Sequence, residues 1–294
     1  MKKIFFTGIF ILLLYGISFP QCNCFRVFHY SGKVYTSSPN KKKLVVPDQV
    51  IKREEILFLE TGSQVILFDS TGNPVVLYQK GNYTFSRLQT LCSEFGNAIT
   101  KKYFQFIWSR MTEEKKKEGN TINASVTRGK KLLMMLPVDS TLLVTDKVYF
   151  QWKPVPGSKK YYLTILDPSG KAIFDKTVAD TTFLWIPEFG KWVSGKMYYW
   201  YVTDIPYPTA DPEKYSFSFA DNKQNESYLT ELNELRKQLH YTPAVNFLLL
   251  AGFFEQKRLF REAYISFHEA LSASPGDTVI QKAVNNFMKR KVVR

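Results

Sequence analysis

Apolar runs of strand length, separated by turn residues at intervals of roughly ten residues, make up the chain from about Phe25 to Leu91. The runs are rich in Val, Ile, Phe and Tyr, and Gly72 can supply the positive φ of a hairpin tip. This spacing is typical of all-β domains. We therefore predict a β domain over residues 25–95.

The order of turns and strands in this region resembles the FecR-type β domain of bacterial envelope proteins. The resemblance is carried by SGKV, a strand, and then LETGSQVILFDSTGNPVVLYQKGNYTF. The family includes periplasmic sensors that relay signals to anti-sigma systems and are not enzymes. The cytoplasmic segment and membrane helix of the relay members are not visible in this sequence, so the resemblance implies a fold and a compartment, not a signalling role.

A helix and a linker are predicted over residues 96–130. Apolar side chains recur at helical spacing from Leu88 to Trp108, and we expect one short helix packed on the first sheet. The following stretch, 111–129, contains EEKKKEGN and lacks apolar side chains to bury, which predicts a flexible linker.

A second series of strand-length runs extends from Lys131 to Phe219 and predicts a β-sandwich over residues 131–220. The segments FQWKPVPGSKKYYLTILDPSGKAIFDKTV and GKMYYWYV resemble fibronectin type III or related immunoglobulin-like modules. This resemblance implies that Trp152 and Trp200 are core anchors.

Helical spacing dominates the C-terminal region, where small and bulky apolar residues match the positions that define a tetratricopeptide repeat. The pattern predicts helices over Pro243–Gln256 and Phe260–Ala273. The matching positions are Phe247, Leu250, Ala251, Phe254, Ala263, Phe267, Ala270 and Pro275.

A single helical hairpin cannot bury both of its faces, so further helices must complete the layer. Helical patterns over Glu226–Leu239 and Val279–Arg290 are the candidates, which gives a four-helix unit over 226–290. The resemblance implies that an envelope protein or a peptide segment docks in a concave groove. The alternative is a structural cap for the sandwich.

The N-terminal residues 1–18 indicate an export signal, because two lysines precede an apolar run that ends at small residues, Gly16 and Ser18. The run is shorter than the ~20 residues that a membrane-spanning helix needs. We expect cleavage, no integral membrane span afterwards, and a mature protein in the periplasm or at the cell surface. The alternatives are an uncleaved tether and a lipid on Cys22, which the preceding Phe-Pro-Gln disfavours.

The cysteines at 22, 24 and 92 are odd in number, so one is left over if two pair. A disulfide of Cys92 with either Cys22 or Cys24 would link the mature N-terminus to the end of the first domain, whereas a Cys22–Cys24 bond would be strained. The histidines match no metal-binding spacing, so we predict no metal or cofactor and place each on the surface. They are His29, His240 and His268.

The net charge of +14 favours anionic partners. An exported chain rarely meets nucleic acid, so we expect none, and acidic envelope polymers are the better candidates. Solvated loops account equally well for the lysine clusters. A sugar-binding aromatic face is an alternative to core packing for Trp185, Trp192, Tyr199 and Tyr201.

Catalytic chemistry is not predicted, since no residue pattern supplies a nucleophile together with its base. Glu54 and Glu55 are adjacent and would point to opposite faces of a strand, and Asp204 with Asp211 is the other carboxylate pair considered. The sequence thus predicts a non-enzymatic exported envelope protein that mediates protein–protein interaction or scaffolding. The alternative function is binding of a glycan or an anionic polymer.

Overall fold

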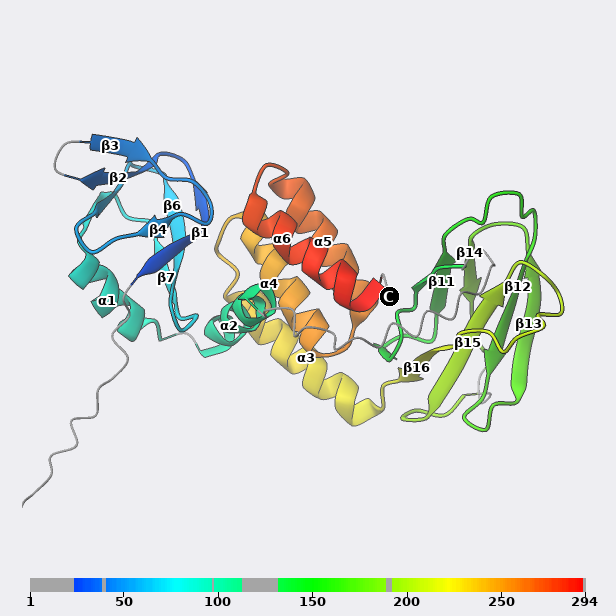
Figure 1. The fold of residues 1–294 in the computed structure, drawn as a ribbon. Helices are drawn as coiled ribbons and strands as arrows, with labels where there is room; N and C mark the ends of the chain where they lie inside the picture. The colour runs from blue at the N-terminus through cyan, green and yellow to red at the C-terminus, as the bar shows by residue number, and fades with distance from the viewer. Residues whose placement is uncertain (1–23, 39–40, 97, 113–131, 189–191, 293–294) are drawn as a thin grey trace, which may run out of the picture.

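The chain folds into β-sheets in its N-terminal and middle parts and into helices in its C-terminal part (Figure 1). This confirms the predicted order of a β-rich region followed by a helical one. The computed structural model describes residues 24–38, 41–96, 98–112, 132–188 and 192–292. The predicted signal, 1–18, and most of the predicted linker, 113–130, lie outside these ranges. In Figure 1 the helical unit lies between the two β units.

The first β unit consists of two four-stranded sheets of order β4-β1-β6-β7 and β3-β2-β5-β8. Its core lies between the sheets and includes Phe25, Val27, Leu57 and Leu67, all fully buried. The strands are β1 (Phe25–Ser31), β2 (Val34–Ser38), β3 (Lys41–Leu44), β4 (Val50–Ile51), β5 (Ile56–Leu59), β6 (Gln64–Asp69), β7 (Pro74–Leu77) and β8 (Gly81–Tyr83).

Strand β6 is buried on both faces. Val65 and Leu67 belong to the core of the first β unit, whereas Ile66 and Phe68 belong to a second core shared with the helices. Burial on both faces explains why this strand is a continuous apolar run, because a half-exposed strand would alternate apolar and polar residues. The sheet that contains β1 and β6 therefore lies between its partner sheet and the helical unit.

The single helix predicted over Leu88–Trp108 is wrong, because two helices occupy this region. Helix α1 (Phe85–Glu94) begins after Thr84, whose side chain accepts a hydrogen bond from the N–H of Arg87. Helix α2 (Ala98–Thr112) follows a break at Phe95, which has an extended backbone and precedes Gly96. The break lets α1 pack on the first β unit while α2 joins the helical unit.

The second β unit is a two-layer arrangement of a five-stranded sheet, β10-β16-β15-β12-β13, and a three-stranded sheet, β14-β11-β9. Trp152 is 1% exposed and Trp200 is 0% exposed, so the prediction that both are core anchors is confirmed. The strands are β9 (Met134–Leu136), β10 (Thr141–Leu143), β11 (Val148–Trp152), β12 (Tyr161–Leu166), β13 (Ala172–Val178), β14 (Thr182–Trp185), β15 (Met197–Thr203) and β16 (Tyr215–Phe219).

Four further helices complete the chain: α3 (Asn222–Lys237), α4 (Pro243–Gln256), α5 (Phe260–Ala273) and α6 (Thr278–Phe287), the last continuing into the short π-helix η1 (Met288–Val292). The bounds predicted for α4 and α5 are confirmed. Helix α3 begins earlier than the predicted Glu226, because Asp221 and Gln224 form a capping box at its N-terminus.

Helix α4 is apolar on nearly all sides, which is expected only of a helix covered all round. It packs along α5 on one side and against α2 on another, and its residues lie in the largest core. Within the described ranges, no helix combines the length and the apolar character needed to cross a membrane.

Candidate interaction groove

The residues of the predicted repeat pattern lie mainly between α4 and α5. Ala251, Ala263 and Ala270 are fully buried, which allows the two helices to approach closely. Of the bulky members of the pattern, Phe254 and Phe267 are buried. The remaining members are half-buried or exposed, namely Phe247, Leu250 and Pro275.

Helix α2 covers a face formed by α4 and α6. Its residues Tyr103 and Ile107 are buried there. A Cβ on Gly252 of α4 would lie 3.0 Å from Cγ1 of Ile107, so glycine at this position lets the two helices meet. A partner segment on this face would have to displace α2.

Glu231 of α3 fastens the first turns of α2. Its Oε1 lies 2.6 Å from Nζ of Lys102 and accepts a 2.5 Å hydrogen bond from the hydroxyl of Tyr103, while its Oε2 pairs with Lys257. Burial alone would raise the pKa of Glu231, but the hydrogen bonds from these neighbours outweigh it and lower the pKa to about 2. Burial and the bond to Glu231 raise the pKa of Tyr103.

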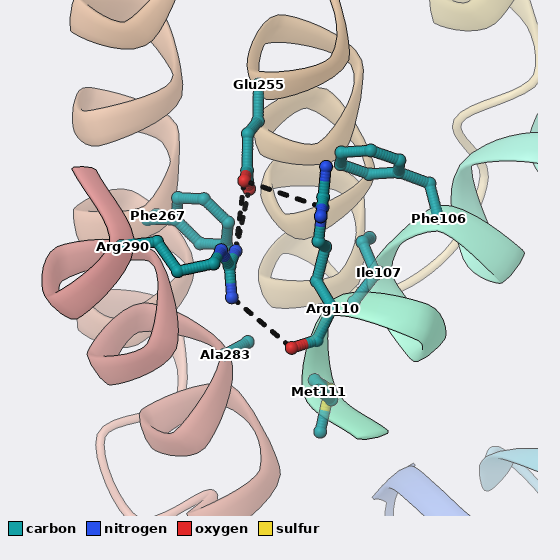
Figure 2. Close-up of a pocket in the computed structure, with 8 residues that line it drawn as sticks. All are labelled: Phe106, Ile107, Arg110, Met111, Glu255, Phe267, Ala283 and Arg290. Carbon is teal, nitrogen blue, oxygen red and sulfur yellow. Dashed lines mark hydrogen bonds and ion pairs between the residues drawn. The ribbon is translucent and has the colours of Figure 1, made fainter. Parts of the chain in front are cut away.

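Glu255 of α4 fastens the last turns of α2 (Figure 2). Nη2 of Arg290 donates to both carboxylate oxygens of Glu255, at 3.0 and 3.3 Å, and Nε of Arg110 lies 3.8 Å from Oε1. Figure 2 shows both guanidinium groups turned toward this carboxylate. The adjoining cavity measures about 10 Å³, room for about one water molecule. This cluster therefore holds α2, α4 and η1 together and is not a ligand site.

The junction between the first β unit and the helices depends on a buried histidine. His29 is 4% exposed, so the prediction that it lies on the surface is wrong, whereas His240 and His268 are exposed. Nδ1 of His29 lies 2.7 Å from Oδ2 of Asp277, and Nε2 lies 3.0 Å from Oγ1 of Thr242. The helices cover this face of β1, which a sequence pattern within β1 does not reveal.

Beside this junction lies a groove of about 320 Å³. One wall is formed by β7 and the residues after it, with Val76 and Tyr78, together with the end of α1, with Glu94 and Phe95. The opposite wall is the turn between α3 and α4, and its lining residues are His240 and Tyr241. This volume falls within the range of small-ligand sites in proteins.

The groove is lined by residues of two structural units, and it was not predicted from the sequence. Tyr78 lies within the segment that carries the FecR resemblance, whereas His240 and Tyr241 lie far from it in the chain. Tyr78 and His240 are exposed rings next to turn residues, a weak sign of a binding role, whereas Tyr241 is buried and carries no such sign.

The aromatic residues considered for sugar binding are separated by the structure. Trp185 is 7% exposed and belongs to the sandwich core, and Trp192 stacks on Phe219 with ring centroids 4.2 Å apart. Tyr199 and Tyr201 alternate with the buried residues of β15 and are half-buried on the outer face of the sheet.

The carboxylates considered for catalysis are not brought together as a site. Oε2 of Glu55 accepts a 2.8 Å hydrogen bond from the backbone N–H of Lys52, and Oδ2 of Asp204 accepts a 3.0 Å bond from Ser158. The remaining residues are Glu54, which is exposed, and Asp211, which pairs with Lys214 at 2.8 Å.

Two of the three cysteines lie within the described ranges. Cys92 is buried on α1, where its Sγ lies 3.5 Å from Oδ2 of Asp69, and Cys24 is half-buried just before β1. Cys22 lies outside the described residues, so the disulfide stays a prediction. Among the described residues, no group of three or more His, Cys, Asp and Glu side chains could hold a metal ion.

Comparison with models of known protein families finds none that matches this chain, and comparison with curated proteins finds no match either.

Proposed function

We propose that this chain is a non-enzymatic, exported envelope protein that mediates protein–protein interaction and acts as a scaffold. One observation carries the proposal: both β units are bonded to the same helical unit by contacts between residues far apart in sequence. His29 contacts Asp277 on one side, and on the other side the guanidinium group of Arg258 donates two bonds, 3.0 and 2.7 Å, to the carbonyl of Ser140. A scaffold needs surfaces held at a fixed separation, and these bonds provide it.

The three units are proposed to be a FecR-like β domain over 25–95, a fibronectin- or immunoglobulin-like sandwich over 131–220 and a tetratricopeptide-like unit over 226–290. Two packed four-stranded sheets support the first assignment, and the tryptophan-centred core between two sheets supports the second. The close packing of α4 on α5 through buried alanines supports the third. Domains of these kinds commonly mediate contacts rather than catalysis.

Cross-linking in intact cells tests the proposal. A photoreactive amino acid is placed at Tyr78 in the groove or at Lys176 on the exposed strand β13, and captured material is identified. We expect one protein partner in stoichiometric yield from at least one position. Recovery of polysaccharide alone from both positions would contradict scaffolding through proteins and support the second function.

That second function is binding of an anionic glycan, and the outer face of the sandwich favours it. Tyr199 and Tyr201 lie half-exposed on β15, and Tyr162 lies on the neighbouring strand β12 in the register that pairs it with Thr203. Aromatic rings on a flat sheet can stack on sugars. Retention on an acidic polysaccharide column that salt weakens, and that Tyr199→Ala reduces, would support this function.

A further inference from the structure

We propose that the groove between β7, α1 and the α3–α4 turn binds a cationic side chain, a lysine or an arginine, presented by a partner protein. The inference rests on the proposed function, since it names the chemistry by which a protein partner would be recognised at one site. It follows from the aromatic lining of the groove, its unneutralised carboxylate and its fixed walls.

The lining has the composition that suits an organic cation. Tyr78, Phe95 and Tyr241 line the groove together with Glu94. The faces of aromatic rings attract ammonium and guanidinium groups because the ring quadrupole is negative there. The aliphatic residues Val75 and Leu91 also line it and can contact the methylene stem of a long side chain. The volume of about 320 Å³ accommodates such a side chain.

The charge of the groove is opposite to that of the whole chain. The protein carries +14, yet among the described residues that line the groove Glu94 is acidic and none is a lysine or an arginine. Within the described part of the chain Glu94 makes no hydrogen bond or ion pair, unlike Glu231 and Glu255, which are each met by two basic side chains. An incoming cation would supply the partner that Glu94 lacks.

The side chain of Tyr78, like that of Glu94, is accessible to an incoming ligand. Its side chain is 62% exposed, and its hydroxyl group makes no hydrogen bond with any other described residue. A large aromatic residue this exposed adds little to the stability of the fold, and its ring is accessible to a partner. Tyr78 and Glu94 can therefore be changed without unfolding the protein.

The two walls of the groove are held in place before any ligand binds. Phe104 of α2 lies behind the groove, with its ring centroid 6.4 Å from that of Phe95 and 5.5 Å from that of Tyr241. The N–H of Tyr241 donates to Oδ1 of Asn246 at 3.2 Å, and Thr242 contacts His29 across the junction. A site fixed in this way loses little conformational entropy on binding.

Three short peptides test the inference on the full chain. Binding of acetyl-Gly-Lys-Gly-amide is compared by NMR titration with that of its norleucine and glutamate analogues, at the same pH for all three peptides. We expect the lysine peptide to bind at least about 3-fold more tightly than the norleucine peptide, and the glutamate peptide more weakly than either.

Variants of the groove locate the site. Glu94→Gln and Tyr78→Ala should each weaken binding of the lysine peptide by roughly 3- to 10-fold. Glu54→Gln, which removes an exposed carboxylate of the first β unit that does not line the groove, should leave binding unchanged. Near-ultraviolet circular dichroism of each variant checks that the fold is kept.

Two results would overturn the inference. Equal binding of the lysine and norleucine peptides would show an apolar groove without selectivity for charge, and unchanged binding by Glu94→Gln and Tyr78→Ala would place the cation elsewhere. The experiments distinguish failure of this inference from failure of the proposed function. If the cross-linker at Lys176 captures a protein partner but the lysine peptide does not bind, the groove proposal is wrong and the scaffold function stands. If the lysine peptide binds but no protein is captured, the scaffold function is wrong and the groove proposal stands.

Discussion

Nδ1 of His29 lies 2.7 Å from Oδ2 of Asp277, and both side chains are only 5% exposed. The other carboxylate oxygen of Asp277 caps α6 by accepting hydrogen bonds from the N–H groups of Val279 and Ile280. On its second nitrogen His29 contacts Thr242, which precedes α4. One imidazole thus joins strand β1 to the N-termini of two helices.

Removing this imidazole should loosen the junction. His29→Ala leaves Oδ2 of Asp277 buried without its partner, and we expect a loss of about 3 kcal/mol in the free energy of unfolding. Urea denaturation followed by circular dichroism measures it. The control is His268→Ala on the exposed face of α5, which should change stability by less than about 0.5 kcal/mol. Equal effects of the two substitutions would show that the buried pair does not hold the junction.

Glycine at position 252 should be required for α2 to lie against α4. Gly252→Val places a branched side chain where a Cβ already lies 3.0 Å from Ile107, so we expect destabilisation by about 2 kcal/mol. The matched control is Gly276→Val, because nothing lies within 4 Å of a Cβ at that position.

The second substitution Ile107→Ala should relieve the clash at position 252. In this background we expect the penalty of Gly252→Val to fall below about 0.5 kcal/mol, because the cavity left by isoleucine accepts the valine. Thermal denaturation of the four proteins in the double-mutant cycle measures the coupling. Additive effects would mean that α2 does not contact α4 at this position.

Acidification should release the N-terminal end of α2 through Glu231. Its pKa is about 2 in the folded protein and ordinarily 4.5, so the unfolded chain takes up the proton first as the pH falls. The stabilisation from Glu231 is therefore complete above pH 4.5 and is lost between pH 4.5 and 2. After solvent screening it amounts to about 1 to 2 kcal/mol.

A comparison of two carboxylate variants isolates this effect. Glu231→Gln should flatten the dependence of stability on pH in the window from 4.5 to 2, whereas Glu234→Gln, an exposed neighbour on α3, should leave it as in the unaltered protein. The denaturant midpoints of both variants and of the unaltered protein are compared across this pH window. An unchanged profile for Glu231→Gln would contradict the lowered pKa.

Arg258 should control the angle between the sandwich and the helices. Besides its two side-chain bonds to Ser140, its carbonyl accepts a 2.9 Å hydrogen bond from the N–H of Leu142. Arg258→Ala removes only the side-chain bonds, and we expect a small loss of about 1 kcal/mol but faster tumbling of the sandwich relative to the helices. NMR relaxation measures this motion, with Lys282→Ala on the exposed face of α6 as the control. Identical relaxation in both variants would show that this bond does not restrain the sandwich.

Local signals in the sequence predicted local structure well. The bounds of α4 and α5 follow from Pro243, which is favoured in the first turn of a helix, and from Pro275 and Gly276 after the second helix. The burial of Trp152 and Trp200 was implied by the resemblance of their segments to fibronectin type III modules. The break between α1 and α2 was also present in the sequence, since Gly96 and Asn97 are common where helices end.

Contacts between distant segments could not be predicted in the same way. The apolar face of α2 shows that the helix must be covered, but the same pattern fits the first sheet as well as α4 and α6. The burial of His29 depends on Asp277, which lies 248 residues away. The groove likewise forms only where β7, α1 and the α3–α4 turn meet, and no periodicity within any one of them encodes it.

Distance measurements between the three units test the central claim, that both β units are fixed to one helical unit. Spin labels carried by noncanonical amino acids at Lys52, Lys282 and Lys176, one exposed site in each unit, leave the native cysteines unchanged. Pulsed electron paramagnetic resonance should give a single narrow distance distribution for each pair of labels, and His29→Ala should broaden the pair that includes Lys52. Broad distributions for both pairs that include Lys282 in the unaltered protein would contradict a rigid scaffold.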